Sequence, residues 1–177
     1  MYVFRKRDPL RKSFEVLYSV RLIKDRISKL QSRIDERAGD LTKRLTDLES
    51  RGEGYLAKRY AEEVAKLRDL SRKLAILLLI VDKVDLALQH AIVLREFNLI
   101  ATELRDLVRD LVNLPETKLP DLSILFLELE ESVRELSEIS IAGHGAGLSY
   151  SPPGSSEVKA IIEEAREALR KRLEPVT

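Results

Sequence analysis

The stretch Arg51-Gly52-Glu53-Gly54 (RGEG, residues 51–54) separates two long helical patterns and decides the fold. Two glycines within three residues, between segments of helical periodicity, predict a tight turn. A connection this short places the flanking helices side by side and antiparallel. We therefore expect an all-α protein built on a long antiparallel helical hairpin.

The segment before this turn has the periodicity of a coiled-coil seam. Pro9 suits the first turn of a helix, where its missing N–H group is not needed. Apolar residues then recur at a mean spacing of about 3.5 residues. The sequence predicts that all of them face a partner helix: Leu10, Phe14, Leu17, Val20, Ile23, Ile27, Leu30, Ile34, Ala38, Leu41, Leu45 and Leu48.

The segment after the turn is longer than its partner. Apolar residues at helical spacing run from Leu56 to Ile92 and can continue through Leu99 to Leu114. An unbroken helix of roughly 60 residues would be about 90 Å long, against about 60 Å for the first helix. Either the distal part, from about Asn98, folds back as a separate helix, or it projects. Periodicity alone leaves both alternatives open.

The rest of the chain predicts two shorter helices. Pro115 and Pro120 bracket a connector, and a third amphipathic segment follows over residues 121–141, with Asp121 as its N-cap. Residues 142–156 are rich in glycine, proline and serine and are expected to form a flexible linker. The predicted organisation is thus a helical core over residues 1–141 with its hairpin at 10–114, the linker at 142–156, and a C-terminal helix at 157–174.

The charges are distributed unevenly along the chain. Lys and Arg number 31 against 30 Asp and Glu, a net charge of +1. Residues 1–51 hold 14 basic and 8 acidic residues, whereas residues 115–177 hold 7 basic and 12 acidic ones. This pattern predicts a basic first helix with a negatively charged partner, and an acidic tail that can compete for the same surface.

The residue inventory points away from enzymatic chemistry. The chain has no cysteine and two histidines, His90 and His144, and none of the common hydrolase, metalloprotease or phosphate-loop motifs occurs. We expect no catalytic residues, no cofactor and no metal site. The longest apolar run, residues 74–81, is far shorter than the roughly 20 residues that a membrane-spanning helix needs.

The basic N-terminal region therefore indicates a surface ligand. Lys and Arg clusters are attracted to anionic bilayers, and residues 1–4 add a small apolar tip. Nucleic acid is the electrostatic alternative, but no aromatic residues interleave with the basic ones for base stacking, so it is not the expected partner. A plain solvated helix face is the third alternative. The candidate membrane-binding residues are Arg5, Lys6, Arg7, Arg11, Lys12, Arg21 and Lys24.

The second helical segment resembles helix 2 of the ESCRT-III family, in its archaeal cell-division (CdvB-like) branch. The resemblance rests on Tyr60-Ala61-Glu62-Glu63-Val64-Ala65-Lys66-Leu67-Arg68, followed by Leu70, Arg72 and Leu74. Arg33-Ile34-Asp35-Glu36-Arg37 and the RGEG turn resemble the end of that family's first helix and its hairpin turn. The similarity covers residues 10–114 well, and residues 121–173 by layout.

This resemblance implies a membrane-remodelling protein without enzymatic activity. Family members polymerise on membranes, alone or with paralogous subunits, and act in cell division or in constriction of other membrane necks. They switch between a closed bundle and a form in which helices 2 and 3 fuse. The family's setting implies a cytoplasmic protein, peripheral to the inner face of the cell membrane.

The family also implies an AAA ATPase partner, which binds a short C-terminal motif through its MIT domain. Leu169, Arg172, Leu173 and Val176 match the order of that helical motif. Arg166 stands where the motif has an acidic residue, and Pro175 interrupts the helix before Val176. A plain amphipathic capping helix is the alternative for this segment. For the whole chain, the alternatives are a coiled-coil adaptor without a lipid role and a nucleic-acid-associated helical protein.

Overall fold

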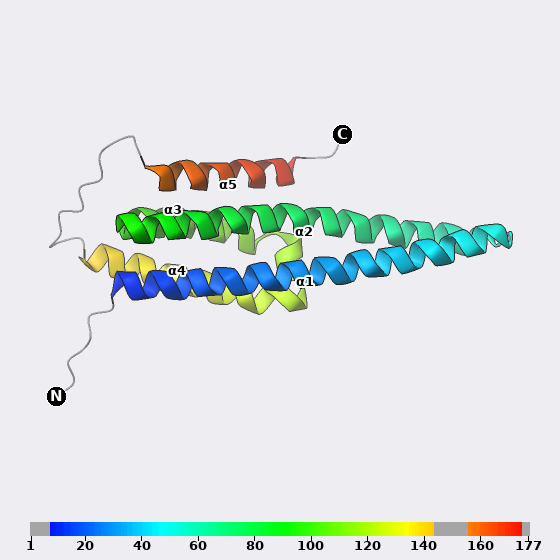
Figure 1. Cartoon of the computed structure of the whole chain (residues 1–177), viewed down its shortest axis with the longest axis horizontal. Helices are drawn as coiled ribbons and strands as arrows, with labels where there is room; N and C mark the ends of the chain where they lie inside the picture. The colour runs from blue at the N-terminus through cyan, green and yellow to red at the C-terminus, as the bar shows by residue number, and fades with distance from the viewer. Residues whose placement is uncertain (1–7, 144–155, 175–177) are drawn as a thin grey trace, which may run out of the picture.

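The computed structural model describes residues 8–143 and 156–174, and these residues form five α-helices and one short 3₁₀-helix (Figure 1). In chain order the elements are α1 Pro9–Ser50, α2 Gly54–Leu94, α3 Phe97–Val112, η1 Pro115–Lys118, α4 Pro120–Gly143 and α5 Glu157–Leu173. The predicted all-α class is confirmed, with α1 and α2 as the long antiparallel hairpin and shorter helices after it.

The hairpin begins and turns where local sequence signals require it. Asp8 caps α1 by accepting a hydrogen bond from the Leu10 amide at 3.0 Å, just before Pro9. At the turn, Gly52 has a φ of +75°, in the left-handed region that glycine tolerates without strain. The Glu53 amide then bonds back to the Leu48 carbonyl at 3.0 Å and closes the end of α1.

The surplus length of the second segment folds back. The break lies at Arg95, whose φ of 55° makes it the only non-glycine residue with positive φ among those described. The Glu96 amide bonds to the Ala91 carbonyl at 2.9 Å, the pattern of a helix end with a left-handed cap. Of the two alternatives left open by periodicity, this structure adopts the folded-back one, with α3 beginning at Phe97.

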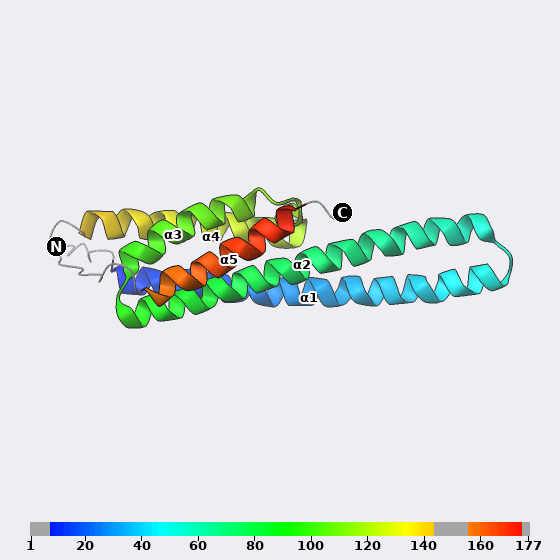
Figure 2. The same ribbon diagram turned by 90° about the horizontal axis from the view of Figure 1, so that it is seen from above.

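The shorter helices pack around one end of the hairpin. In Figure 1, α5 lies on one side of α2 and α3, while α1 and α4 lie on the other, and the tip of the hairpin extends alone beyond the bundle (Figures 1 and 2). The core runs through the bundled end and includes Ile23, Ile27, Leu77, Leu88 and Phe126, all almost fully buried. Elements far apart in sequence are therefore joined by a single apolar core.

Two detailed expectations, on Phe14 and Asp121, were wrong, and one apolar residue of α2 is uncovered. Phe14 belongs to the predicted seam of α1, yet its side chain is 52% exposed, because Ser13, Val16 and Leu17 face the core instead. Leu56 near the hairpin tip is also exposed, since no further helix covers the projecting hairpin. Asp121 is not an N-cap: it lies inside the first turn of α4, which begins one residue earlier at Pro120.

Candidate functional site

The candidate membrane-binding residues occupy three different environments. Arg5, Lys6 and Arg7 lie outside the described residues. Arg11 points to solvent, with its side chain 71% exposed and only a 4.0 Å contact to Glu15 one turn later. Such an exposed pair holds the guanidinium weakly, so Arg11 can meet an external anion at little cost.

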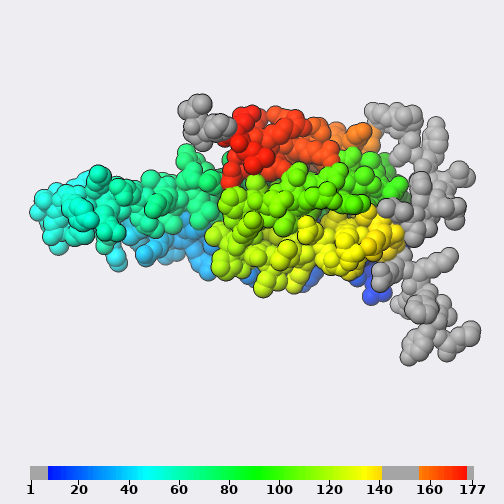
Figure 3. Space-filling view, turned by 180° about the vertical axis from the view of Figure 1, so that it is seen from behind, coloured from blue at the N-terminus to red at the C-terminus, as the bar shows by residue number. Residues whose placement is uncertain are grey.

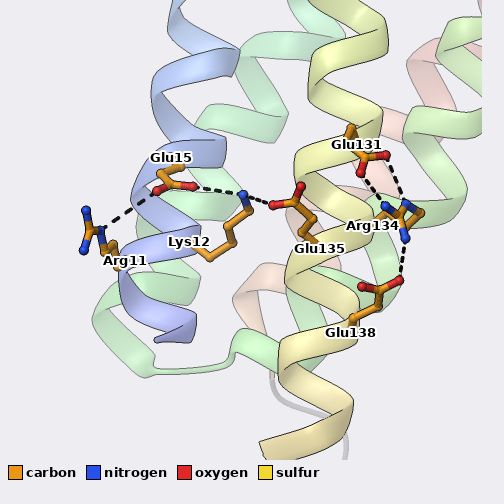
Figure 4. A network of polar contacts seen from close by, with 7 residues as sticks. All are labelled: Arg11, Lys12, Glu15, Glu131, Arg134, Glu135 and Glu138. Atoms are coloured by element: carbon orange, nitrogen blue, oxygen red, sulfur yellow. Dashed lines mark hydrogen bonds and ion pairs between the residues drawn. The ribbon is translucent and has the colours of Figure 1, made fainter. Parts of the chain in front are cut away.

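Lys12 instead lies between α1 and α4. Its ammonium group contacts Glu15 at 2.9 Å and also pairs with Glu135 of α4, and its side chain is mostly covered (Figure 4). Partial burial opposes the charged form, but the hydrogen bonds to Glu135 and Glu15 outweigh it and raise the pKa of Lys12. In this conformation Lys12 joins α1 to α4 and is not presented to an outside ligand.

Lys24 and Arg21 hold α1 to α2. The Lys24 ammonium lies 2.9 Å from an oxygen of Asp82 and 3.0 Å from one of Asp85, and the Arg21 Nε lies 3.5 Å from the same Asp85 oxygen. The hydrogen bond to Asp82, followed by that to Asp85, raises the pKa of Lys24. Lys24 is thus largely engaged within the hairpin, whereas Arg21 keeps more than half of its side chain exposed.

Asp85 is the buried centre of this contact. Burial alone would raise the pKa of its carboxyl group, but the hydrogen bond from Gln89, at 2.6 Å, and that from Lys24 outweigh it and lower the pKa. A buried carboxylate needs such partners to stay charged. The ion pairs of Lys24 and Arg21 with Asp85 fix which turn of α1 lies against which turn of α2.

The candidate partner-binding residues of α5 are largely occupied within the chain. Leu169 is buried, and Arg172 donates two hydrogen bonds to Glu116 of η1, Nε to Oε2 at 2.6 Å and Nη2 to Oε1 at 2.7 Å. Leu173 is exposed, and Val176 lies outside the described residues. The docked α5 therefore exposes only Leu173 of the three motif residues that can be placed.

Further polar contacts fasten α5 along its length. Arg166 pairs with Glu103 of α3 at 2.6 Å, and Lys83 of α2 pairs with Glu164 at 2.8 Å. Near the start of α5, the His90 Nδ1 lies 3.0 Å from a Glu157 oxygen. Because these contacts reach only α2, α3 and η1, α5 leaves the basic surface of α1 uncovered.

The acidity predicted for the tail lies in α4. Residues 120–143 contain six acidic residues and one basic residue, whereas residues 157–173 contain four acidic and five basic ones. Two acidic residues of α4 meet α1 directly: Glu135 at Lys12, and Asp121 at Arg33, 2.6 Å away. The acidic partners of the basic helix are thus its neighbours α4 and α2, and not the distant helix α5.

Two exposed apolar stripes were not predicted from the sequence. One lies on α1 and consists of Phe14, Tyr18 and Leu22. The other lies on α2 and consists of Leu79, Leu86 and Val93, at intervals of seven residues. Their spacing is visible in the sequence. However, Phe14 was assigned to the buried seam of α1, and the other five residues were not assigned to any surface.

No group of three or more histidine or acidic side chains in residues 8–143 and 156–174 could hold a metal ion. Across the same residues, none of the helices combines the length and apolar character that crossing a membrane demands.

The chain is similar in sequence to a known cell-division protein. The chain is 26% identical over 171 residues to Cell division protein B1 of Sulfolobus acidocaldarius, a match that covers 96% of this chain and 79% of that protein. No protein-family model and no solved structure matches the chain.

Proposed function

We propose, on the premise that this chain is a distant homologue of the archaeal ESCRT-III cell-division proteins, that it is a polymerising membrane-remodelling subunit. It would act in cell division or in constriction of another membrane neck. The observation that carries this proposal is the relative named for cell division, which matches nearly the whole chain and thus includes the hairpin and the helices behind it.

The exposed stripe on α2 supports the polymerisation part. Leu79, Leu86 and Val93 lie seven residues apart, which is the repeat of a coiled-coil seam, and all three remain outside the core. Aliphatic side chains at this spacing suit another helix, and we assign them to a second copy of this chain. Charged substitutions such as Leu86→Glu should then reduce assembly without unfolding the protein, because the side chain is already exposed.

The fold supports a change of shape on assembly. Opening the break at Arg95 would fuse α2 with α3 into a helix that outreaches α1, as the family resemblance implies. The paired helices of the hairpin tip already project from the bundle (Figure 2). Opening would instead extend α3 beyond the opposite end of the hairpin, past the start of α1, and present new apolar surface to neighbouring subunits.

Partner ATPase recruitment belongs to the same proposal. Leu169 and Arg172 would have to leave the bundle before an MIT domain could bind them, because both are now engaged within the chain. Disassembly by the ATPase would therefore act on subunits whose α5 has been released. A cytoplasmic place at the inner face of the cell membrane follows from this scheme.

The pairing of Lys12 and Lys24 favours a second candidate function. If those ion pairs persist in solution, the basic residues predicted for lipid serve to hold the bundle, as in a coiled-coil adaptor without a lipid role. The two functions predict different behaviour with lipid vesicles.

Electron microscopy of the purified full-length chain, with and without vesicles containing anionic lipid, tests the proposal. The remodelling function predicts filaments or coated tubules in the presence of these vesicles. Vesicle pelleting at low ionic strength provides a separate measure of binding. Absence of pelleting would overturn the lipid role, and absence of polymers under every condition would favour the adaptor.

A further inference from the structure

The outer face of α1 presents an apolar stripe to solvent. Phe14, Tyr18 and Leu22 are 52%, 66% and 41% exposed, and they follow one another at four-residue steps. Residues at this spacing lie on the same face of a helix. Two of the three are aromatic, in a chain whose aromatic content is only 5%. An exposed cluster of this kind marks a contact surface rather than an ordinary solvated face.

Basic side chains surround this stripe and continue its face along the helix. Arg11 and Arg21 flank it, and both keep more than half of their side chain exposed. Further along α1 lies a shallow hollow of about 680 Å³ where the helix meets the start of α4. The hollow is lined by Arg26, Ser28, Lys29, Ser32, Arg33 and Asp121. Three cations and two hydroxyl groups thus surround a space large enough for a phosphate-bearing headgroup.

The acidic residues of α1 on this face, Asp25 and Glu15, leave it with an excess of positive charge. Asp25 pairs with Lys29 at 2.9 Å, and Glu15 is shared between Arg11 and Lys12. The Arg26 guanidinium reaches only the backbone carbonyl of Asp121, at 3.4 Å. Five exposed basic residues against these two acids and Asp121, which pairs with Arg33, still give a surface that attracts anions.

The face remains open while the rest of the bundle is closed. Seen from behind, α3, α4 and α5 cover the bundle and α1 shows along its lower edge (Figure 3). The docked α5 lies across α2 from α1 (Figure 1). A ligand can therefore reach Phe14, Tyr18 and Leu22 without any release of α5 or opening at Arg95.

We propose that an anionic lipid bilayer covers the outer face of α1, with Phe14, Tyr18 and Leu22 entering the interfacial region. The neighbouring arginines and Lys29 would bind headgroup phosphates. This inference rests on the proposed function and adds the residues and the mode of contact. Helices that lie in the bilayer surface combine aromatic or leucine side chains with Lys and Arg in this way. The α2 stripe offers aliphatic residues without aromatic anchors, and for that reason we assign it to protein.

The proposal separates two groups of basic residues. Lys12 and Lys24 are mostly covered and hold the bundle together, while the exposed Arg11, Arg26 and Arg33 bind the membrane, with Asp121 competing for Arg33. Because apolar insertion does not depend on charge, part of the binding should survive salt that screens the arginines. A purely electrostatic contact would be abolished by the same salt.

Tryptophan substitution gives a direct readout, because the chain contains no tryptophan. Tyr18→Trp places a reporter in the stripe, and Tyr55→Trp places one at the hairpin tip, where the tyrosine is 73% exposed. Vesicles of phosphatidylcholine and phosphatidylglycerol, with and without bromine on the acyl chains, provide the probe. We expect the emission of Tyr18→Trp to shift to shorter wavelength and to be quenched by the brominated lipid, and that of Tyr55→Trp to do neither.

The outcomes distinguish this inference from the proposed function. If the chain pellets with vesicles but Tyr18→Trp is not quenched, insertion is wrong and the general lipid role stands. If the chain does not pellet at all, both fall. A shift that depends on protein concentration and not on lipid would show that a second copy occupies the face, and would overturn the inference.

A second variant tests the same point without a reporter. Phe14→Ser, Tyr18→Ser and Leu22→Ser combined should weaken vesicle binding by about tenfold or more, because interfacial binding scales with the apolar area that is inserted. The same three changes should abolish the salt-resistant part of the binding. Far-ultraviolet circular dichroism checks that the helices remain, as expected for three exposed positions. Unchanged binding in high salt by a folded variant contradicts the proposal.

Discussion

Arg172 of α5 and Glu116 of η1 form a two-hydrogen-bond ion pair that is almost closed to solvent, with 13% of the arginine side chain and 1% of the glutamate side chain exposed. Removing one member of a buried pair leaves the other charge unpaired, which typically costs about 3–5 kcal/mol. This cost destabilises the state in which α5 is docked. It does not affect the released state, because Glu116 regains water once α5 leaves.

Arg172→Ala should therefore release α5 from the bundle. Hydrogen exchange of residues 157–173 would measure this, with protection lost while α1 and α2 keep theirs. Arg170→Ala is the matched control, since Arg170 pairs only with Glu163 and Glu167 of its own helix. Equal loss of protection in the two variants would show that the pair with Glu116 does not hold α5.

The hairpin contact centred on Asp85 predicts a dependence on pH. Its pKa is lowered in the folded protein, despite burial, by hydrogen bonds from Gln89 and Lys24. A carboxyl group with a lowered folded pKa stabilises the fold above its ordinary pKa of 3.8, and this contribution is lost as pH falls through the folded value. Stability should thus decrease in acid below about pH 4.

Asp85→Asn tests this prediction. The amide cannot pair with Lys24 as a charge, so at neutral pH we expect a loss of about 1–3 kcal/mol in the free energy of unfolding, measured in urea. The difference from the wild type should shrink in acid. Asp25→Asn removes an exposed pair within α1 and should leave both curves nearly unchanged. A constant difference at all pH values would contradict the assignment.

The two glycines of the turn make different contributions. Gly52 needs its positive φ of +75°, so Gly52→Ala should destabilise the hairpin by about 1–2 kcal/mol. Gly54 is the first residue of α2, it lacks a positive φ, and an added Cβ would meet nothing within 4 Å. Gly54→Ala should therefore stabilise the protein by about 0.4–1 kcal/mol. Thermal unfolding followed by circular dichroism would distinguish them, and effects of the same sign would contradict this account.

The sequence predicted the architecture well because the signals for it are local. The RGEG turn, the absence of proline between Leu10 and Leu114, and the helical periodicity are all read from neighbouring residues. The resemblance to archaeal cell-division proteins also rests on neighbouring residues, those of the second helical segment. It is confirmed by a relative whose match covers 96% of the chain.

The placement of the predicted site residues could not be read from the sequence. Whether Lys12 meets Glu135, or Arg172 meets Glu116, depends on how helices more than 50 residues apart pack together. The exposed position of Phe14 has the same origin, because only the path of α2, α3 and α4 around α1 decides which apolar residues are covered.

The break at Arg95 allows a direct test of the proposed change of shape, the fusion of α2 with α3. Arg95 holds a left-handed conformation with φ 55° that costs an ordinary residue about 1–2 kcal/mol and glycine almost nothing. In a fused α2–α3 helix the preference reverses, because glycine is about 1 kcal/mol worse than arginine inside a helix. Arg95→Gly should therefore stabilise the folded-back form and destabilise the fused helix. The two effects together favour the folded-back form by roughly 2–3 kcal/mol.

Spin labels on α2 and α3 would report the population of the folded-back form through their distance. We expect Arg95→Gly to suppress the extended population under conditions where the wild type polymerises, and to reduce polymer formation. Arg68→Gly is the control, because Arg68 is exposed within α2 and carries the same helix penalty away from the break. If Arg68→Gly reduced assembly as much as Arg95→Gly, the effect would lie in helix propensity alone and Arg95 would not be the hinge.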